Sequence, residues 1–157
     1  MLLALVGLAA QAQTTPSPSP QAGELTVVIV ESAATRSLLN DSYDRLSRVF
    51  LAVLEERKWP LKIKDERFGA NQPQHDLELR VYYQGITRDT PQELTFRASM
   101  MFFHHGEKQD LGVIRYTFSP RPGEMMDESL DKVVAGAARI AADRIEPTLF
   151  PQGTPHR

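Results

Sequence analysis

Three consecutive segments of this chain alternate between apolar and polar residues, and only short turn sequences separate them. They span residues 76–88, 93–104 and 111–118. In the first segment Leu77 and Leu79 share one side, whereas Glu78 and Arg80 share the other. A period of two is that of a β-strand with one buried face, and short turns join strands antiparallel. The pattern therefore predicts an antiparallel meander of three strands, with a bulge where Gly85 shifts the phase.

The residues before the meander predict a strand, a helix and a second strand. Residues 25–31 are apolar on both faces, which is typical of a central strand covered on each side. Between residues 38 and 58 apolar side chains recur at helical spacing, and the Trp59-Pro60 pair predicts the helix end because the residue before proline disfavours helical angles. Residues 61–68 then alternate again. If the two strands lie parallel, the crossover between them is right-handed.

A second amphipathic helix is predicted after the meander, from about residue 127 to residue 146, and Pro147 is expected to end it. Its apolar stripe contains several alanines and Gly136, so its backbone can come close to a neighbour. The element order is β-α-β-β-β-β-α. Because each helix has one apolar face, we expect an α+β fold: a mostly antiparallel, twisted sheet with both helices packed on one face.

The N-terminus predicts export. Residues 1–12 combine an apolar run with Ala10-Gln11-Ala12, a small-x-small sequence typical of signal-peptidase sites, although no Lys or Arg precedes the run. The run is far shorter than the roughly 20 residues that span a bilayer as a helix, so we expect no membrane span after cleavage. Pro alternates with Ser in the next stretch, which favours an extended tether. We therefore predict a periplasmic or secreted protein with a leader over 1–12, a linker over 13–23, one domain over 24–150 and a tail over 151–157.

Composition and motifs exclude several functional classes. The chain has no cysteine, which excludes disulfides, thiolate zinc sites, thiol catalysis and a lipid anchor on an N-terminal cysteine. A net charge of -2 gives no overall basic field, so we expect no nucleic-acid partner. The sequence contains no nucleophile elbow, P-loop, dinucleotide fingerprint or paired-histidine zinc helix. We expect no cofactor, and we favour a binding protein over an enzyme.

The polar side of the predicted meander carries a mixture of charged and aromatic residues. If both helices cover one face of the sheet, this side forms the other, partly covered face. Arginine and aromatic side chains together suit contact with a ligand or partner. Our candidate binding surface consists of Arg80, Tyr82, Arg97, Met101 and Phe103. The alternative is that Tyr82 and the arginines pair with carboxylates across the strands.

His104 and His105 form the most conspicuous histidine pair. Glu107 and Asp110 lie near them in the sequence and could add oxygen ligands to a metal site. Neighbours in a strand point to opposite faces, however, so both imidazoles reach one ion only if the turn rearranges them. We interpret the pair as a solvated hairpin tip and treat it as a weak metal candidate.

Acidic residues could serve an enzyme that acts on an envelope polymer. The candidates are Asp65, Glu66 and Glu78, which would need to converge in a cleft with raised pKa values. No spacing ties two of them to acid-base catalysis. Solvation of the surface explains them adequately.

The linear plan resembles the small α/β domain shared by the curli secretion protein CsgG, the penicillin-binding-protein activator LpoB and the N-terminal domain of TolB. The resemblance rests on the hydrophobic strand Leu25-Thr26-Val27-Val28-Ile29-Val30, the amphipathic helix over 38–58, the acidic start of the strand Asp76-Leu77-Glu78-Leu79 and the Gly106-Glu107 hairpin tip. It covers roughly residues 24–150. The chain lacks the lipobox cysteine of these proteins, and residues 69–74 replace their middle helix. The resemblance implies a non-catalytic envelope module that binds another protein.

Three functional hypotheses remain open. The leading one is a secreted or periplasmic accessory module of the cell envelope that acts through protein contacts, with another envelope protein as its partner. The second is the enzyme acting on an envelope polymer. The third is a self-assembling structural protein whose edge strand pairs with a copy of itself.

Overall fold

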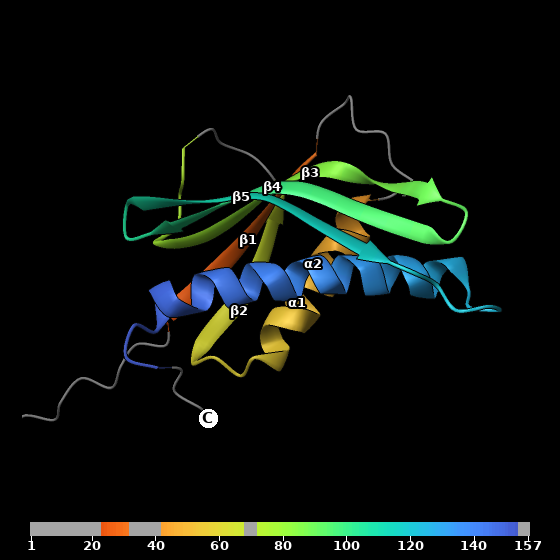
Figure 1. Ribbon diagram of the computed structural model, residues 1–157. Coiled ribbons are helices and arrows are strands. Elements are labelled where there is room, and N and C mark those ends of the chain that lie inside the picture. Colours follow the sequence, from red (N-terminus) through yellow and green to blue (C-terminus); the bar gives the residue numbers. More distant parts are fainter. Residues whose placement is uncertain (1–22, 32–41, 68–71, 154–157) are drawn as a thin grey trace, which may run out of the picture.

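The computed structural model describes residues 23–31, 42–67 and 72–153, which build a five-stranded sheet and two helices (Figure 1). The elements are β1 (Gly23–Glu31), α1 (Ser42–Glu56), β2 (Leu61–Arg67), β3 (Leu77–Thr90), β4 (Glu93–His104), β5 (Glu107–Phe118) and α2 (Met126–Leu149). This order and the α+β class confirm the predicted fold. The predicted leader, the linker up to residue 22 and the tail from residue 154 lie outside the described residues.

The strands lie in the order β2-β1-β3-β4-β5, so β1 is central, as its two apolar faces predict. It runs parallel to both neighbours, β2 and β3. The meander β3-β4-β5 is antiparallel, and its two ladders are longer than the parallel ones. The register shift between Tyr83 and Gly85 confirms the predicted bulge, and the φ of 141° at Gly85 suits glycine.

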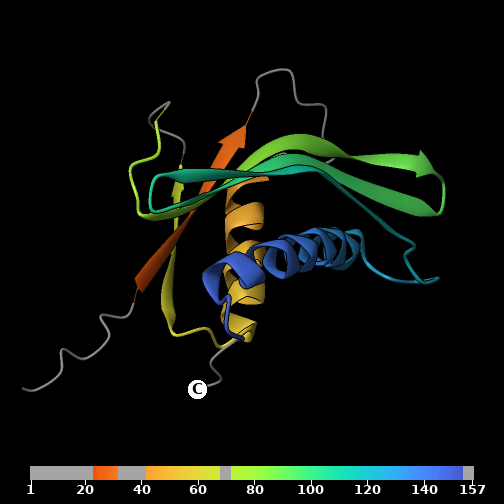
Figure 2. The same ribbon diagram turned by 60° about the vertical axis from the view of Figure 1, so that its left-hand side comes forward.

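Both helices cover the same face of the sheet (Figure 2), which we call the inner face, and the opposite face is the outer face. Helix α1 packs on β1 and β2, whereas α2 packs on β4 and β5. Ion pairs join the two helices, among them Arg45 with Asp131 at 2.6 Å and Arg48 with Asp131 at 2.9 Å, and Arg57, directly after α1, pairs with Asp143 at 2.5 Å. None of the described helices is long and apolar enough to cross a membrane.

The core lies between the inner face and the helices. Its largest fully buried side chains include Tyr83, Phe50, Phe96, Phe102, Leu46, Leu54 and Leu79. Helix α2 comes close to β5 because Gly136 has no side chain: a Cβ there would lie 2.1 Å from the Tyr116 ring. The run of small residues in α2 thus has the packing role that the sequence predicts.

The predicted end of α2 is wrong. Pro147 lies inside the helix, which continues to Leu149. A proline lacks only its own amide hydrogen, and in the last turn of a helix the loss of one intrahelical bond is tolerated. The Phe150 amide then donates to the Glu146 carbonyl at 2.9 Å and closes the final turn.

Two other predicted boundaries are also wrong. Strand β5 begins at Glu107, four residues before its predicted start at residue 111, because the turn holds only His105 and Gly106. Both have positive φ, 49° and 84°, as a two-residue hairpin turn requires. Helix α1 ends at Glu56, and Lys58, with φ of 53°, occupies the left-handed position that often follows a helix.

Candidate functional site

The outer face of β3, β4 and β5 brings most of the predicted surface residues together. The strand register sets Tyr82 opposite Ser99, and Ser99 opposite Val113. One step along the strands, Met101 lies opposite Arg80 and Asp110. Side chains on one face of neighbouring strands are in contact range. These rows therefore form one continuous surface.

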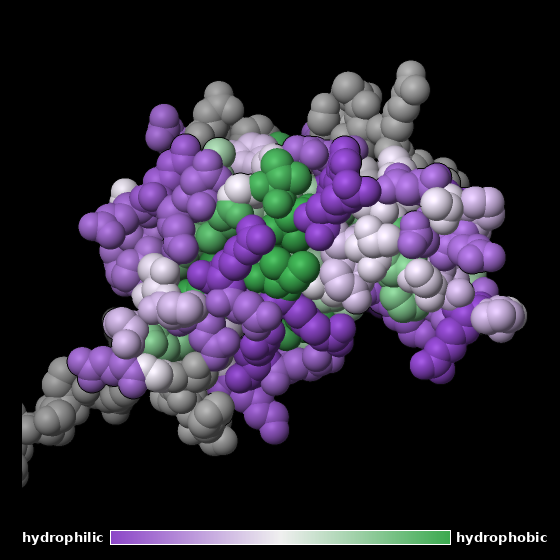
Figure 3. Space-filling view, viewed as in Figure 1, coloured by the Kyte–Doolittle hydropathy of each residue, from purple (hydrophilic) through white to green (hydrophobic). Residues whose placement is uncertain are grey.

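The open part of this surface, which we call the outer patch, consists of Tyr82, Arg97, Met101, Phe103 and Val113. Tyr82, Met101 and Phe103 are half-buried, Arg97 is exposed, and Val113 is 57% exposed. Figure 3 views the side of the molecule where β5 and α2 meet, and not the outer face; strongly hydrophobic side chains gather there, with hydrophilic residues around them.

Val113 is the residue of the outer patch that sequence reasoning missed. A bulge in β5 is the cause: Gly112 pairs with Met100 and Asp110 with Met101, so Leu111 is an extra residue. Gly112, with φ of 70°, accommodates the bulge. Before Leu111 the even-numbered side chains of β5 face outward, and after it the odd-numbered ones do. Simple alternation therefore cannot place Val113.

Arg80 lies beneath the outer patch and not on its surface. It is 3% exposed and pairs with the Glu78 carboxylate, which is itself 1% exposed. Burial would lower the pKa of the guanidinium, but the Glu78 and Tyr82 side chains raise it above its ordinary value. The guanidinium carbon lies 5.4 Å from the centre of the Phe103 ring. Arg80 thus supports Phe103 from below.

The described part of the connection from β2 to β3, residues 72–76, lies over the other half of the outer face. The Gln74 amide donates to the Glu78 carboxylate at 2.9 Å, and the His75 imidazole lies 2.7 Å from the Glu66 carboxylate. Because Glu66 and Glu78 lie on the two strands that flank β1, these contacts hold Gln74 and His75 over β1. Thr26 of β1 is 2% exposed there, and its hydroxyl has no partner among the described residues. The parallel half of the outer face is covered, whereas the antiparallel half is open.

Charge on the outer patch is concentrated at Arg97. It lies opposite Arg115 of β5, and Arg115 pairs with Asp89 at 3.0 Å. Arg97 makes no ion pair within the described part of the chain. The alternative that Arg80 and Arg97 pair with carboxylates across the strands therefore fits neither residue, because the partner of Arg80 is Glu78 of the same strand and Arg97 makes no ion pair among the described residues.

The histidine pair lies at the hairpin tip between β4 and β5. The His104 and His105 rings are 4.5 Å apart, and the His105 amide donates to the Asp76 carbonyl at 2.7 Å. Within residues 23–31, 42–67 and 72–153 no group of three or more His, Asp and Glu side chains could hold a metal ion. The two histidines thus lie at a hairpin tip, as we interpret them from the sequence.

The three candidate carboxylates each have a separate partner. Asp65 faces α1, where the hydroxyls of Ser47 and Tyr43 donate to it at 2.6 Å each. These hydrogen bonds lower the pKa of Asp65, whereas burial and the Asp65 carboxylate raise the pKa of Tyr43 to about 12. Glu66 and Glu78 lie on the outer face with His75 and Arg80. Asp65 is thus a stabilised carboxylate, unlike a general acid, which needs a raised pKa.

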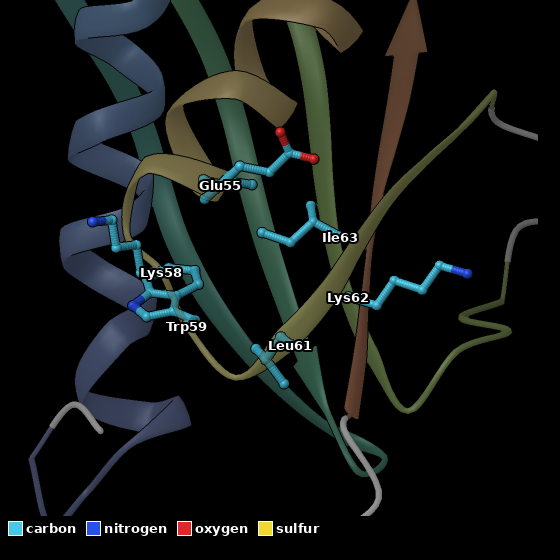
Figure 4. A pocket seen from close by; sticks show the side chains of 7 residues that line it. Glu55, Lys58, Trp59, Leu61, Lys62 and Ile63 are labelled. Carbon is cyan, nitrogen blue, oxygen red and sulfur yellow. The ribbon is translucent and has the colours of Figure 1, made fainter. Parts of the chain in front are cut away.

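A groove of about 480 Å³ lies beside β2, under the end of α1 (Figure 4). It is lined by Leu54, Glu55, Lys58, Trp59, Leu61, Lys62 and Ile63. Trp59 is 3% exposed, and its indole N–H is buried without a hydrogen-bond partner among the described residues. Sequence reasoning missed this groove because it explained Trp59-Pro60 only as a helix end. The groove exists because the fold brings the end of α1 beside the start of β2.

Comparison with known proteins adds a fold likeness. No family model and no curated protein matches the chain. Among solved structures, the hypothetical protein CT253 from Chlamydia trachomatis aligns with a TM-score of 0.53 and 8% identity, over 83% of this chain and 100% of that one. A PelC dodecamer from Paraburkholderia phytofirmans aligns with a TM-score of 0.51 and 10% identity, over 80% of this chain and 92% of that one. The rare lipoprotein B from Shewanella oneidensis aligns with a TM-score of 0.38 and 15% identity, over 82% of this chain and 99% of that one. For the first two structures these identities show a likeness of the fold alone.

Proposed function

We propose that this chain is a non-catalytic accessory module of the cell envelope, periplasmic or secreted, that binds another protein through the outer patch. The observation that carries the proposal is Val113, a large apolar side chain that is 57% exposed in the middle of a strand. Half-buried Tyr82 lies in the same row, across Ser99. Contiguous apolar surface of this kind often marks an interaction site in soluble proteins.

The composition of the outer patch favours a protein partner. Tyrosine, phenylalanine, methionine and arginine are enriched at the centres of protein interfaces, and tyrosine and arginine contribute most often to binding energy. Arg97 offers a guanidinium that is free of ion pairs within the described residues and suits a carboxylate on the partner. The net charge of -2 argues against nucleic acid.

Arg80 has a positioning role in this proposal. Its buried guanidinium fixes the Phe103 ring from below, so the aromatic side chain is ordered before a partner binds. An anchor that is ordered in advance loses less conformational entropy on binding. We therefore expect Arg80 to affect affinity without touching the partner.

Support for the envelope location comes from the N-terminal sequence. The apolar run and the small-x-small sequence Ala10-Gln11-Ala12 favour export, and the Pro/Ser-rich stretch that follows suits a tether. The resemblance to the CsgG, LpoB and TolB domain implies the same compartment and the same kind of task.

A capture experiment from envelope extract tests the proposal. The double variant Tyr82→Ala with Arg97→Ala should lose a partner that the unmodified protein retains, since both changes lie in the outer patch. Met125→Ala with Arg121→Ala is the matched control, because these exposed residues lie in the connection from β5 to α2. Equal capture by both double variants would count against the outer patch.

Self-association is a second candidate function. The specific observation in its favour is that PelC, which shares the fold, forms a dodecamer. The outer patch or a sheet edge of one copy would then meet a second copy. Sedimentation over a wide concentration range tests this, and a monomer at every concentration would exclude it.

A further inference from the structure

Strand β5 forms one edge of the sheet, and its first half is blocked. Within the described part of the chain β5 pairs only with β4. The bulge at Leu111 distorts the strand, and the Arg144 side chain of α2 donates to the Leu111 carbonyl. A bulge and a covering helix both hinder the addition of another strand. Residues 107–111 are therefore a poor seat for a further strand.

The second half of the same edge lacks such obstacles. Beyond Gly112 the ladder to β4 is regular, and no side chain of the described residues binds the backbone of residues 113–118. At the opposite edge of the sheet, β2 carries the exposed Lys62 and Lys64. Lysines on an edge strand disfavour the addition of another strand. Residues 113–118 are thus the most accessible stretch of sheet edge in the described part of the chain.

Apolar side chains flank this open stretch on both sides of the sheet. On the outer face Val113 is 57% exposed. On the inner side, Gly136 of α2 packs on the Tyr116 ring, and Arg144 binds the bulge. Ile140 lies one helical turn from each of them, so it faces the same part of β5, and it is half-buried like Tyr116. The hydrophobic side chains in Figure 3 gather on this side, where β5 and α2 meet.

The polar side chains of the open stretch bind toward the middle of the sheet. Arg115 is the charged residue of this stretch, and it pairs with Asp89 of β3 at 3.0 Å. The Thr117 hydroxyl lies 3.1 Å from the Thr95 hydroxyl of β4. Both neighbours lie on the side of β5 that faces the sheet. The edge itself therefore offers backbone N–H and C=O groups between two apolar flanks.

We propose that residues 113–118 of β5 bind an extended segment of the partner protein, which adds to the sheet as a sixth strand. The proposal rests on the proposed function, since Val113 belongs to the outer patch. The segment is apolar on both faces: its side chains on one face meet Val113, and those on the other meet Ile140 and Tyr116. Backbone hydrogen bonds supply affinity, and the side chains supply specificity.

A second copy of β5 suits this stretch less well. A symmetric β5–β5 pair centred on Val113 would need residues 109–111 of both copies, which the bulge and α2 obstruct. A pair centred on Arg115 would set Val113 opposite Thr117, so the exposed apolar side chain would not meet another one. A partner segment that is apolar on both faces matches Val113 and Ile140 at once.

Fluorescence anisotropy with labelled synthetic peptides tests strand addition on the purified full-length protein. The peptide KKTVIVTKK, with an apolar centre and lysines for solubility, should bind at least about tenfold more tightly than KKTSTSTKK. Successive amides of a strand point to opposite edges. N-methylation of the even-numbered or of the odd-numbered central residues should therefore abolish binding in one case and spare it in the other. Binding that survives both methylations, or equal binding of KKTSTSTKK, would overturn the proposal.

NMR spectra locate the bound peptide. Adding KKTVIVTKK should shift the amide signals of residues 113–118 and slow their exchange with solvent, because hydrogen-bonded amides exchange slowly. The amide signals of β2 should stay in place. Shifts confined to β2, or to the outer-patch residues of β3 and β4, would contradict strand addition at β5.

Two variants place a lysine beside the open stretch. Val113→Lys and Ile140→Lys should each weaken the binding of KKTVIVTKK at least about tenfold. The matched control Gln92→Lys, at an exposed position of the β3–β4 turn, should leave binding unchanged. Val113 is more than half exposed, so Val113→Lys should retain the Tm even if Ile140→Lys lowers it. Full affinity in both variants would mean that the peptide does not use this edge.

Ile140→Lys also separates strand addition from the proposed function, because it leaves the outer face unchanged. In the capture experiment it should lose the partner, as Tyr82→Ala with Arg97→Ala does. If Ile140→Lys keeps the partner while the double variant loses it, the outer patch stands and strand addition is wrong. If Val113→Lys instead abolishes a dimer seen by sedimentation, the occupant is a second copy and the proposal is wrong.

Discussion

The two faces of the sheet are closed in different ways. The inner face is sealed by α1 and α2, and its side chains are almost wholly apolar. The outer face is closed over β1 and the start of β3, where the polar residues Glu78 and Arg80 are buried. Over β4 and β5 it is open, with Val113 at 57% exposure. One set of strands thus carries a sealed core, a buried polar layer and an open apolar surface.

This difference separates residues that serve folding from residues that are free for binding. Side chains that gain from leaving water lie on the inner face, where hydrophobic burial stabilises the fold. Apolar side chains of the outer patch gain little from folding because they stay partly in water. We infer that their gain comes when a partner covers them. Substitutions on the inner face should therefore lower the free energy of unfolding, whereas substitutions on the outer patch should mainly lower the affinity for a partner.

The largest expected loss of stability is on the inner face. Phe50 of α1 is fully buried, so Phe50→Ala should lower the free energy of unfolding by about 3–5 kcal/mol. Phe103→Ala on the outer patch should cost well under half as much, since that ring is half-buried. Urea unfolding of both variants measures the difference. Equal losses would mean that the outer face is part of the core.

The buried polar layer should respond differently to one substitution than to two. Glu78→Ala leaves the Arg80 guanidinium buried without its carboxylate, which should cost about 3 kcal/mol. Replacing both by apolar residues, Glu78→Leu with Arg80→Met, should restore most of the lost stability. Urea unfolding of the single and the double variant measures both changes in the free energy of unfolding. If the double variant is less stable than the single one, the layer depends on more than this pair.

Gly136 tests how closely α2 packs on the inner face. Alanine is the better helix former by about 1 kcal/mol, yet its Cβ would overlap the Tyr116 ring. We therefore expect Gly136→Ala to lower the free energy of unfolding by about 1–2 kcal/mol. Adding Tyr116→Val should make the same alanine stabilising. A stabilising Gly136→Ala in the unmodified background would contradict the close packing of α2 and β5.

Asp65 predicts a dependence of stability on pH. Its folded pKa is lowered by the Ser47 and Tyr43 hydroxyls, so it stabilises the fold above the unfolded pKa of about 3.9. That contribution is lost as the pH falls through the lower folded pKa. Asp65→Asn should therefore lower the free energy of unfolding at neutral pH, and the variant should lose less of that free energy than the unmodified protein when the pH falls. An acid transition identical in both proteins would rule out this role.

The smallest expected effect on stability is at Val113. Val113→Asp should change the free energy of unfolding by less than about 1 kcal/mol, because the side chain is more than half exposed and only strand propensity changes. Thermal unfolding measures this. A loss as large as that of Phe50→Ala would mean that Val113 belongs to the core and not to the outer patch.

The predictable part of the fold is the part set by local periodicity. Alternation identified the meander, and helical spacing identified α1 and α2, because each period assigns one face to the core. Gly85 indicated the bulge in β3 because the alternation changes phase at this residue. Pro147 led to a wrong prediction of the end of α2, because the helix tolerates the lost hydrogen bond in its last turn. Local signals therefore gave the elements correctly and their ends less well.

The site was predictable only in part. Tyr82, Arg97, Met101 and Phe103 reach the surface that their alternation indicates. Arg80 is buried together with its partner Glu78, to which the Gln74 amide donates, and strand alternation alone does not report this burial. Val113 was missed because the bulge at Leu111 reverses the parity of β5. These residues depend on tertiary contacts and strand register.

Site-specific photocrosslinking in intact cells tests the central claim most directly. A photoreactive amino acid replaces Val113 in one variant and Met125, another exposed apolar residue at 71%, in the matched control. We predict a discrete adduct with one envelope protein at position 113, identified by mass spectrometry and lost when Tyr82→Ala and Arg97→Ala are added. The same adducts at both positions, or none at position 113, would contradict the account.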